Sequence, residues 1–153
     1  MKIIPVRDFL QALHDLYPAP VSPVGDDELV CPSLDWVKTK FIPWMLPQMP
    51  SYQLARFDCE NYAIRGQDRF SECLRSSLDN EFIGKGEAFC RVAVELFSPL
   101  NNVPAAGNRR HALNLFMDDT GELWFLEPQN GQLTNAKQAV KAGVCKPYYY
   151  GII

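Results

Sequence analysis

The stretch HALNLFMDDTGELWFLEPQ, residues 111–129, constrains the fold more than any other part of the sequence. Two segments rich in apolar and aromatic residues flank the short polar segment DDTG, which is typical of a β-hairpin. We expect a type I turn over residues 118–121 with a bulge at Gly121. This turn would pair Asp118 with Glu122 and so set the register of the whole hairpin.

The predicted register gathers polar side chains at one end of an apolar face. Counting back from the turn places His111 opposite Gln129 and diagonal to Glu127. Because side chains alternate along a strand, these three share a face with Leu113, Leu115, Met117, Leu123 and Phe125. Burial of polar groups is costly unless they hydrogen-bond, so we expect them to contact one another. A slip of one residue at the turn would break the group.

Helical periodicity dominates the first half of the chain and strand patterns dominate the second. We expect helices at residues 6–16, 34–46 and 59–77, the second capped by Ser33 and kinked or stopped at Pro43. We expect strands at 89–97, 111–117, 122–129 and in the closing YYYGII, with a short helix at 135–142. The residues between Pro18 and Ser33, which include Cys31, are assigned to a loop. Helices followed by antiparallel strands predict an α+β fold, with residues 1–153 forming a single domain.

Composition excludes several classes of protein. The chain has 153 residues, of which 47% are hydrophobic and 22% charged, and its net charge of −3 gives no nucleic-acid footprint. No apolar run approaches the length that a membrane helix needs, and acidic residues interrupt the first 18 residues, so no secretory signal is expected. The five cysteines form no CxxC pair, which argues against a zinc site and favours a reduced, cytoplasmic setting.

Cys59 stands out among the cysteines because it opens the predicted third helix. Asp58 is a good N-cap residue, and the helix dipole favours a thiolate at this position. The flanking acids Asp58 and Glu60 oppose the thiolate by charge repulsion. A thiol nucleophile needs an imidazole as its base, and the imidazole needs an acceptor on its second nitrogen. His111 and Glu127 can fill these two roles, so we predict Cys59, His111 and Glu127 as catalytic residues.

The remaining candidates have simpler interpretations. His14 lies within an amphipathic helix. The other four cysteines are more typical of packing than of chemistry: Cys31, Cys73, Cys90 and Cys145.

Three sequence blocks resemble a known family. FDCENYA, HALNLF and FLEPQNGQ, spread over residues 57–132, resemble the papain-like C-terminal domain of the Marasmius oreades agglutinin and its stand-alone bacterial and phage relatives. The resemblance implies a papain-like fold, with N-terminal helices packed on a C-terminal antiparallel sheet. It also implies a cysteine peptidase whose triad is carried by Cys59, His111 and Glu127. The sugar-binding trefoil repeats of the agglutinin are absent from this sequence.

The same resemblance suggests calcium activation, with Asp58 and Glu60 as metal ligands. This sequence has Glu60-Asn61 where relatives often have two aspartates. Calcium prefers several oxygen ligands, so further acids from the 26–27 or 118–119 segments would be needed. The alternative is that Asp58 is only a cap and Glu60 only a solvated acid.

Two glutamines are candidates for the oxyanion hole. Gln53 precedes Cys59 by six residues, the spacing that papain-like enzymes use, and Gln129 shares the face of Glu127. The walls of the cleft are expected to include Trp36, Tyr52 and Trp124.

The function predicted on these grounds is a cysteine hydrolase acting on peptide or isopeptide bonds of a peptide or protein substrate. No cofactor is required, and calcium is the candidate ion. Two alternatives remain: a transglutaminase-type acyltransferase, and a non-catalytic papain-fold interaction module of phage or bacterial origin. Oligomeric state has no signal in the sequence.

Overall fold

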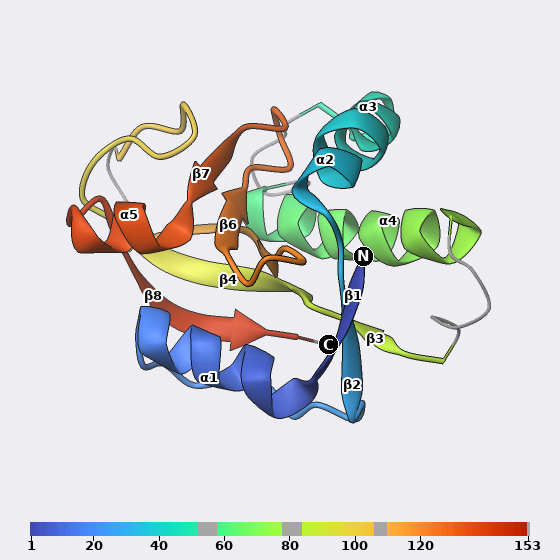
Figure 1. The fold of residues 1–153 in the computed structure, drawn as a ribbon. Helices are drawn as coiled ribbons and strands as arrows, with labels where there is room; N and C mark the ends of the chain where they lie inside the picture. The colour runs from blue at the N-terminus through green and yellow to red at the C-terminus, as the bar shows by residue number, and fades with distance from the viewer. Residues whose placement is uncertain (52–57, 78–83, 106–109, 153) are drawn as a thin grey trace.

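A five-stranded antiparallel sheet forms the centre of the computed structural model, which describes residues 1–51, 58–77, 84–105 and 110–152. Its strand order is β7-β6-β5-β4-β8 (Figure 1). The strands are β4 (Phe89–Leu96), β5 (Arg110–Met117), β6 (Leu123–Leu126), β7 (Leu133–Asn135) and β8 (Cys145–Gly151). The observed fold is therefore of the predicted α+β class.

A second, smaller sheet was missed by the sequence analysis. It joins β1 (Lys2–Pro5), β2 (Glu28–Cys31) and β3 (Gly86–Glu87), with β1 antiparallel and β3 parallel to β2. The prediction that Cys31 lies in a loop was wrong, because Leu29, Val30 and Cys31 are buried in β2. Strands of two to four residues are too short to show a period of two, and β7 was missed for the same reason.

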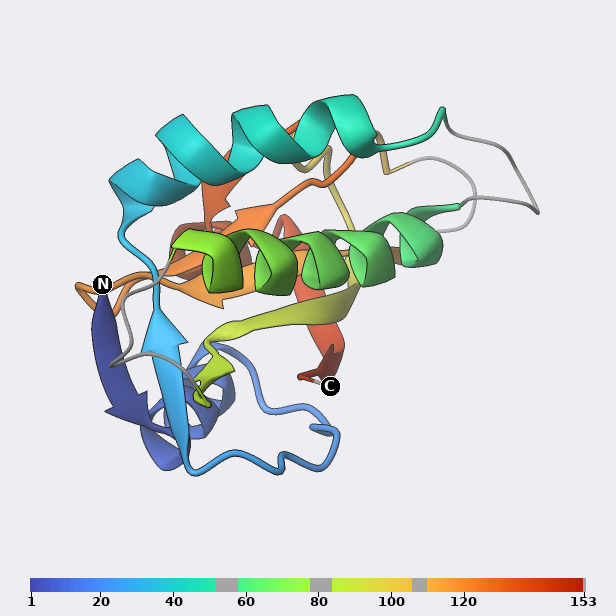
Figure 2. The same cartoon turned by 90° about the vertical axis from the view of Figure 1, so that its right-hand side faces the viewer.

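Helices cover both faces of the central sheet. The first core lies between the sheet and α1 (Val6–Leu16) with α5 (Ala136–Lys141), where Phe9 and Leu13 pack with Leu113 and Leu115. The second core lies under α4 (Cys59–Ser77), where Phe70 stacks on Phe89 with ring centroids 4.1 Å apart. Figure 2 shows α4 running across the sheet, with the helical residues 34–48 alongside it. Among the described residues, none of the helices combines the length and the hydropathy that a bilayer crossing requires.

Residues 34–48 form one continuous helical run of changing pitch. Its parts are α2 (Leu34–Trp36), a π-helical turn η1 (Val37–Phe41), α3 (Ile42–Met45) and a 3₁₀ turn η2 (Leu46–Gln48). Ser33 caps the run as predicted, because its Oγ accepts a hydrogen bond from the Trp36 N–H at 3.1 Å. The run does not stop at Pro43. The π turn ends at Phe41, two residues before this proline, which cannot donate a backbone hydrogen bond to the preceding turn.

The hairpin has the predicted register. The Asp118 N–H donates to the Glu122 carbonyl at 2.9 Å, the Gly121 N–H donates to the Asp118 carbonyl at 3.0 Å, and Gly121 has a φ of 91°. Burial opposes ionisation of Asp118, but hydrogen bonds from Thr120, Trp124 and backbone N–H groups outweigh it and lower the pKa of this carboxyl. The carboxylate of Asp118, the first residue of the turn, therefore stabilises the turn by accepting these hydrogen bonds.

A close contact between α4 and β5 fixes the helix against the sheet. A Cβ atom at Gly66 would lie 2.2 Å from Oδ1 of Asn114 and 3.3 Å from Cβ of Pro128. Asn114 is fully buried, and its Nδ2 donates to the carbonyl of Ala63 at 2.8 Å and to that of Cys90 at 3.5 Å. The absence of a side chain at Gly66 thus lets the helix lie directly on the Asn114 amide.

We predict that Gly66→Ala lowers the free energy of unfolding by about 1–3 kcal/mol, because the new methyl group overlaps a buried amide. This range is the net loss, because the gain of about 1 kcal/mol that alanine brings to a helix interior offsets part of a larger overlap cost. Urea denaturation followed by circular dichroism would measure the change. Gly25→Ala is the matched control, since nothing lies within 4 Å of its added Cβ. Equal stability of the two variants would contradict the contact.

Candidate functional site

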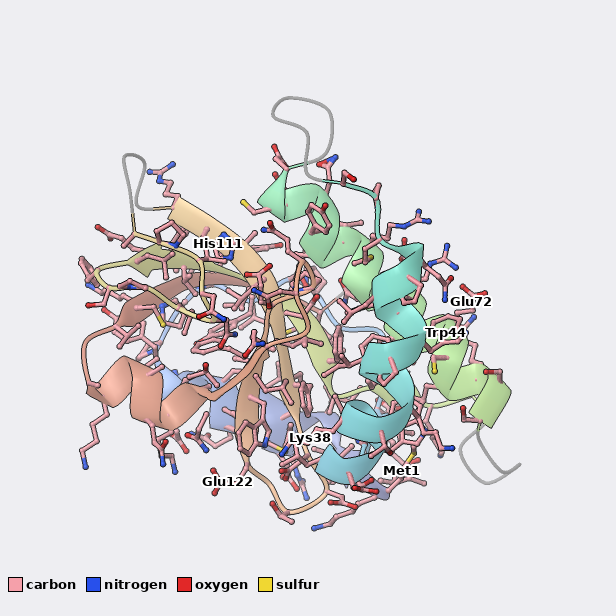
Figure 3. All side chains as sticks on the ribbon, turned by 90° about the horizontal axis from the view of Figure 1, so that it is seen from above. Met1, Lys38, Trp44, Glu72, His111 and Glu122 are labelled. Atoms are coloured by element: carbon pink, nitrogen blue, oxygen red, sulfur yellow. The ribbon has the colours of Figure 1, made fainter. Side chains whose placement is uncertain are left out.

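The start of α4 and the start of β5 meet at one end of the sheet. In Figure 3 His111 lies near the first turn of α4. Asp58 caps this helix, because its Oδ1 accepts hydrogen bonds from the backbone N–H groups of Glu60 at 3.1 Å and Asn61 at 3.2 Å. The cap places Cys59 at the first helical position, facing the strand that carries His111.

The three residues predicted as catalytic form one chain of hydrogen bonds. His111 Nε2 lies 2.6 Å from Glu127 Oε2, and the His111 ring also hydrogen-bonds the Cys59 thiol. Since Glu127 engages Nε2, the nitrogen left for Cys59 is Nδ1. Glu127 is fully buried and His111 is only 6% exposed, whereas Cys59 is partly open to solvent. The Cys59 sulfur is thus the accessible end of a chain of hydrogen bonds that is otherwise buried.

Glu127 is held by the turn that follows β6. Its backbone N–H donates to Gln132 at 3.0 Å, and its carbonyl accepts from Gly131 at 2.8 Å. Its Oε1 accepts from the backbone N–H of Gln129 at 3.3 Å, which leaves Oε2 directed at His111. The structure therefore uses the backbone of Gln129 to orient the carboxylate. An oxyanion role for the Gln129 side chain stays a prediction, and Gln53 lies outside the described residues.

Electrostatics favour an ion pair between Cys59 and His111. The pKa of the Cys59 thiol is lowered, chiefly by its hydrogen bond with His111, against burial and the charge of Asp58. The backbone N–H of Ala112 also hydrogen-bonds the sulfur and favours the thiolate. Burial opposes protonation of His111, but hydrogen bonds to Cys59 and Glu127 outweigh it and raise the pKa of the imidazole to about 9. Both shifts favour the thiolate–imidazolium pair over the neutral thiol and imidazole.

The other four cysteines have the opposite electrostatic setting. Burial raises the pKa of Cys31 and of Cys145 to about 12 each, and it also raises the pKa values of Cys73 and Cys90. All four are buried. Thiolate chemistry within the chain is consequently concentrated at Cys59.

The Cys59 thiol opens into a groove of about 360 Å³. The groove is lined by the start of α4 and by residues of β4, β5 and β8: Asp58, Cys59, Glu60, Arg91, Val92, Ala93, Arg110, His111, Ala112, Tyr148 and Tyr149. Two of the predicted wall residues lie elsewhere. Trp36 packs on Phe41 and Phe70 in the second core, and Trp124 donates to Asp118, while Tyr52 lies outside the described residues.

The described residues give little support to a calcium site at Asp58 and Glu60. One oxygen of Asp58 is committed to the helix cap, and the exposed Glu60 lies 4.0 Å from Arg91. Asp118, proposed as a further ligand, is occupied by its own turn. Within residues 1–51, 58–77, 84–105 and 110–152, no group of three or more His, Cys, Asp or Glu side chains could hold a metal ion. Calcium binding therefore stays a prediction.

The sequence analysis missed several residues that shape this site. Asn114 ties the first turns of α4 to β5, and Arg91, Arg110 and Tyr148 line the groove. A signal for Asn114 existed, because it is a polar residue within the apolar run LNLF. The groove residues gave no comparable signal, since an arginine or tyrosine on an outward strand face is ordinary.

Comparisons with known proteins give a fold and no family. No family model matches the chain, and no curated protein matches it. One solved structure of similar fold is a PSL1a-E64 complex, with a TM-score of 0.65 and 15% identity over 97% of this chain and 51% of that one. Another is the Polyporus squamosus lectin bound to the human-type influenza-binding epitope Neu5Aca2-6Galb1-4GlcNAc, with a TM-score of 0.69 and 16% identity over 97% and 49%. At these identities the likeness shows the fold alone, and the chain spans about half the length of each structure.

These matches correct the functional prediction from the sequence. The matched structure that is named for its function is a lectin bound to a glycan epitope, and neither structure is described as a peptidase. The assignment to the peptidase family, the hydrolase activity on peptide or isopeptide bonds and the peptide or protein substrate are therefore withdrawn. The three-block resemblance rests on short segments that form one hairpin and one helix start, which carry structure as well as chemistry.

We predict that iodoacetamide modifies Cys59 faster than any of the other four cysteines, with a pH midpoint below the ordinary thiol value of 9.0. The reason is that the thiolate is the reactive form and only Cys59 combines access with a lowered pKa. Peptide mapping after brief labelling at several pH values would measure both quantities. Equal labelling of Cys31 or Cys145 in folded protein would contradict the geometry.

Glu127→Gln should raise the pH midpoint of Cys59 alkylation and slow the reaction near neutral pH. Glutamine removes the charge that supports the imidazolium, so the imidazolium supports the thiolate less well. Glu122→Gln is the matched control, because Glu122 is exposed at the hairpin turn, where its Oε2 accepts a hydrogen bond from Asn135 Nδ2 at 3.1 Å. An unchanged midpoint in a folded Glu127 variant would remove this residue from the site.

Proposed function

We propose that this chain is a papain-fold interaction module that engages its ligand through the Cys59 thiolate. A helix that begins with a cysteine and packs on an antiparallel sheet carrying a histidine is the arrangement that supports a papain-like fold. The groove beside Cys59 is the binding surface of the module.

The observation that carries this proposal is the hydrogen-bonded chain from Cys59 through His111 to Glu127. A buried carboxylate and a buried imidazole are costly to desolvate. Their alignment on an accessible sulfur activates that sulfur as a nucleophile, which is a chemical reason for burying them. The thiolate attacks the carbonyl carbon of an acyl ligand and forms a sulfur–carbon bond. The bond to the leaving group breaks, and that group departs with the proton of His111. The product is a thioester on Cys59.

The likeness to a lectin favours a binding role over a hydrolytic one. The Polyporus squamosus lectin is described as bound to a glycan epitope. The chain spans about half of that lectin, so the glycan does not carry over directly to this chain. A glycan is therefore one candidate ligand among compounds that carry an acyl group.

A second candidate function is acyl transfer to an amine. It is favoured by the position of His111, which becomes neutral once its proton has left and can then accept a proton from an attacking amine. The amine nitrogen would bond to the acyl carbon and release the Cys59 thiolate. The two candidates differ only in the fate of the thioester.

Reaction with p-nitrophenyl acetate tests both candidates. The interaction module predicts the release of one equivalent of nitrophenolate per protein, with acetyl found on Cys59 by peptide mapping. Acyl transfer predicts continued release when glycinamide is added. Cys59→Ser should abolish this release, whereas Cys145→Ser, the matched control at a buried thiol outside the groove, should retain it.

Two outcomes would overturn the proposal. One is a lack of acetylation at Cys59 in folded protein. The other is continued release in buffer without an amine at a rate well above the hydrolysis of a free thioester.

A further inference from the structure

A β-bulge in β8 places an additional aromatic residue at the groove. In the pairing of β4 with β8, Ala93 lies opposite Tyr149 and Val94 lies opposite Pro147, so that Tyr148 has no partner on β4. A bulge of this kind bends the strand and redirects a side chain, and bulges often occur beside functional sites. Tyr148 is 42% exposed and lines the groove. This bulge therefore brings both Tyr148 and Tyr149 to the groove that contains Cys59.

The floor of the groove is made by two alanines. Ala93 on β4 pairs with Ala112 on β5 and with Tyr149 on β8, which gives a row of two methyl groups and one ring across three strands. All three residues are half-buried and line the groove beside Cys59. Larger side chains at the two alanine positions would occupy the space above the sheet, so their small size leaves an apolar shelf next to the sulfur.

The charged side chains around this shelf each have a nearby partner. Arg91 and Glu60 face one another at 4.0 Å, and one oxygen of Asp58 is used by the helix cap. The guanidinium of Arg110 lies 5.8 Å from the centre of the Tyr148 ring, a cation–π distance that steadies the ring. The shelf itself is therefore uncharged, with two aromatic rings at its side.

We propose that Ala93, Ala112, Tyr148 and Tyr149 form a subsite for an uncharged aromatic group carried by the acyl ligand of Cys59. This inference deepens the proposed function and rests on it. An aromatic ring lying on two methyl groups and against two tyrosines buries apolar area and gains ring–ring contact. Its attachment to the reactive carbonyl brings that carbon to the thiolate.

Alkylation of Cys59 by a series of iodoacetyl reagents tests the subsite. The series is iodoacetamide, N-benzyl-iodoacetamide, iodoacetate and N-iodoacetylglucosamine, each rate being divided by the rate of the same reagent with glutathione. We expect the benzyl reagent to react about 3- to 10-fold faster than iodoacetamide, the range that one aromatic pair supports.

Two variants assign this preference to the subsite. Tyr148→Ala should bring the benzyl-to-iodoacetamide ratio close to one, and Ala93→Val should lower the same ratio by filling the shelf. Phe97→Ala, which removes an exposed ring that does not line the groove, should leave the ratio unchanged.

The outcomes separate the subsite from the underlying proposal. If Cys59 is no more reactive than the other cysteines, the proposed function fails. If Cys59 is reactive but shows no benzyl preference, or keeps it in Tyr148→Ala, only the subsite is overturned. Preference for iodoacetate or for the glucosamine reagent would overturn the aromatic ligand in favour of an anion or a sugar.

Discussion

The buried amide of Asn114 holds the two halves of the site at their working distance. It donates to the carbonyl of Ala63, one turn after Cys59, and it lies three residues after His111 on the same strand. Gly66 allows this contact because any side chain there would collide with the amide oxygen. The distance between the Cys59 sulfur and the His111 imidazole therefore depends on the hydrogen bond from Asn114 to Ala63, which involves neither residue.

Burial and hydrogen bonding oppose each other at His111, and hydrogen bonding prevails. Desolvation alone would favour the neutral ring, yet its two partners raise the pKa of the imidazole from 6.5 to about 9. A group whose folded pKa is raised stabilises the fold fully below its unfolded pKa. That contribution is lost as the pH rises through about 9. The charged histidine is thus part of the stability of the folded site across the neutral range.

The sequence predicted the parts of the structure that have a strong local signal. The turn at Asp118 set the hairpin register, and Asp58 marked the start of α4, so the two ends of the site could be placed before the fold was known. The small sheet and the β8 bulge could not be predicted, because they depend on pairings between distant segments or on one unpaired residue. Function was predicted least well, since short blocks that resemble a peptidase also encode a helix start and a hairpin.

The separation of Cys59 and His111 along the chain has a consequence for how this thiol behaves during folding. The two residues approach only when α4 has packed on β5, so an unfolded chain carries five ordinary thiols and no activated one. Reactivity at Cys59 is therefore a property of tertiary structure and not of the sequence around the sulfur. The rate at which a small electrophile modifies this cysteine would report, in a mixture of molecules, the fraction in which helix and sheet have docked.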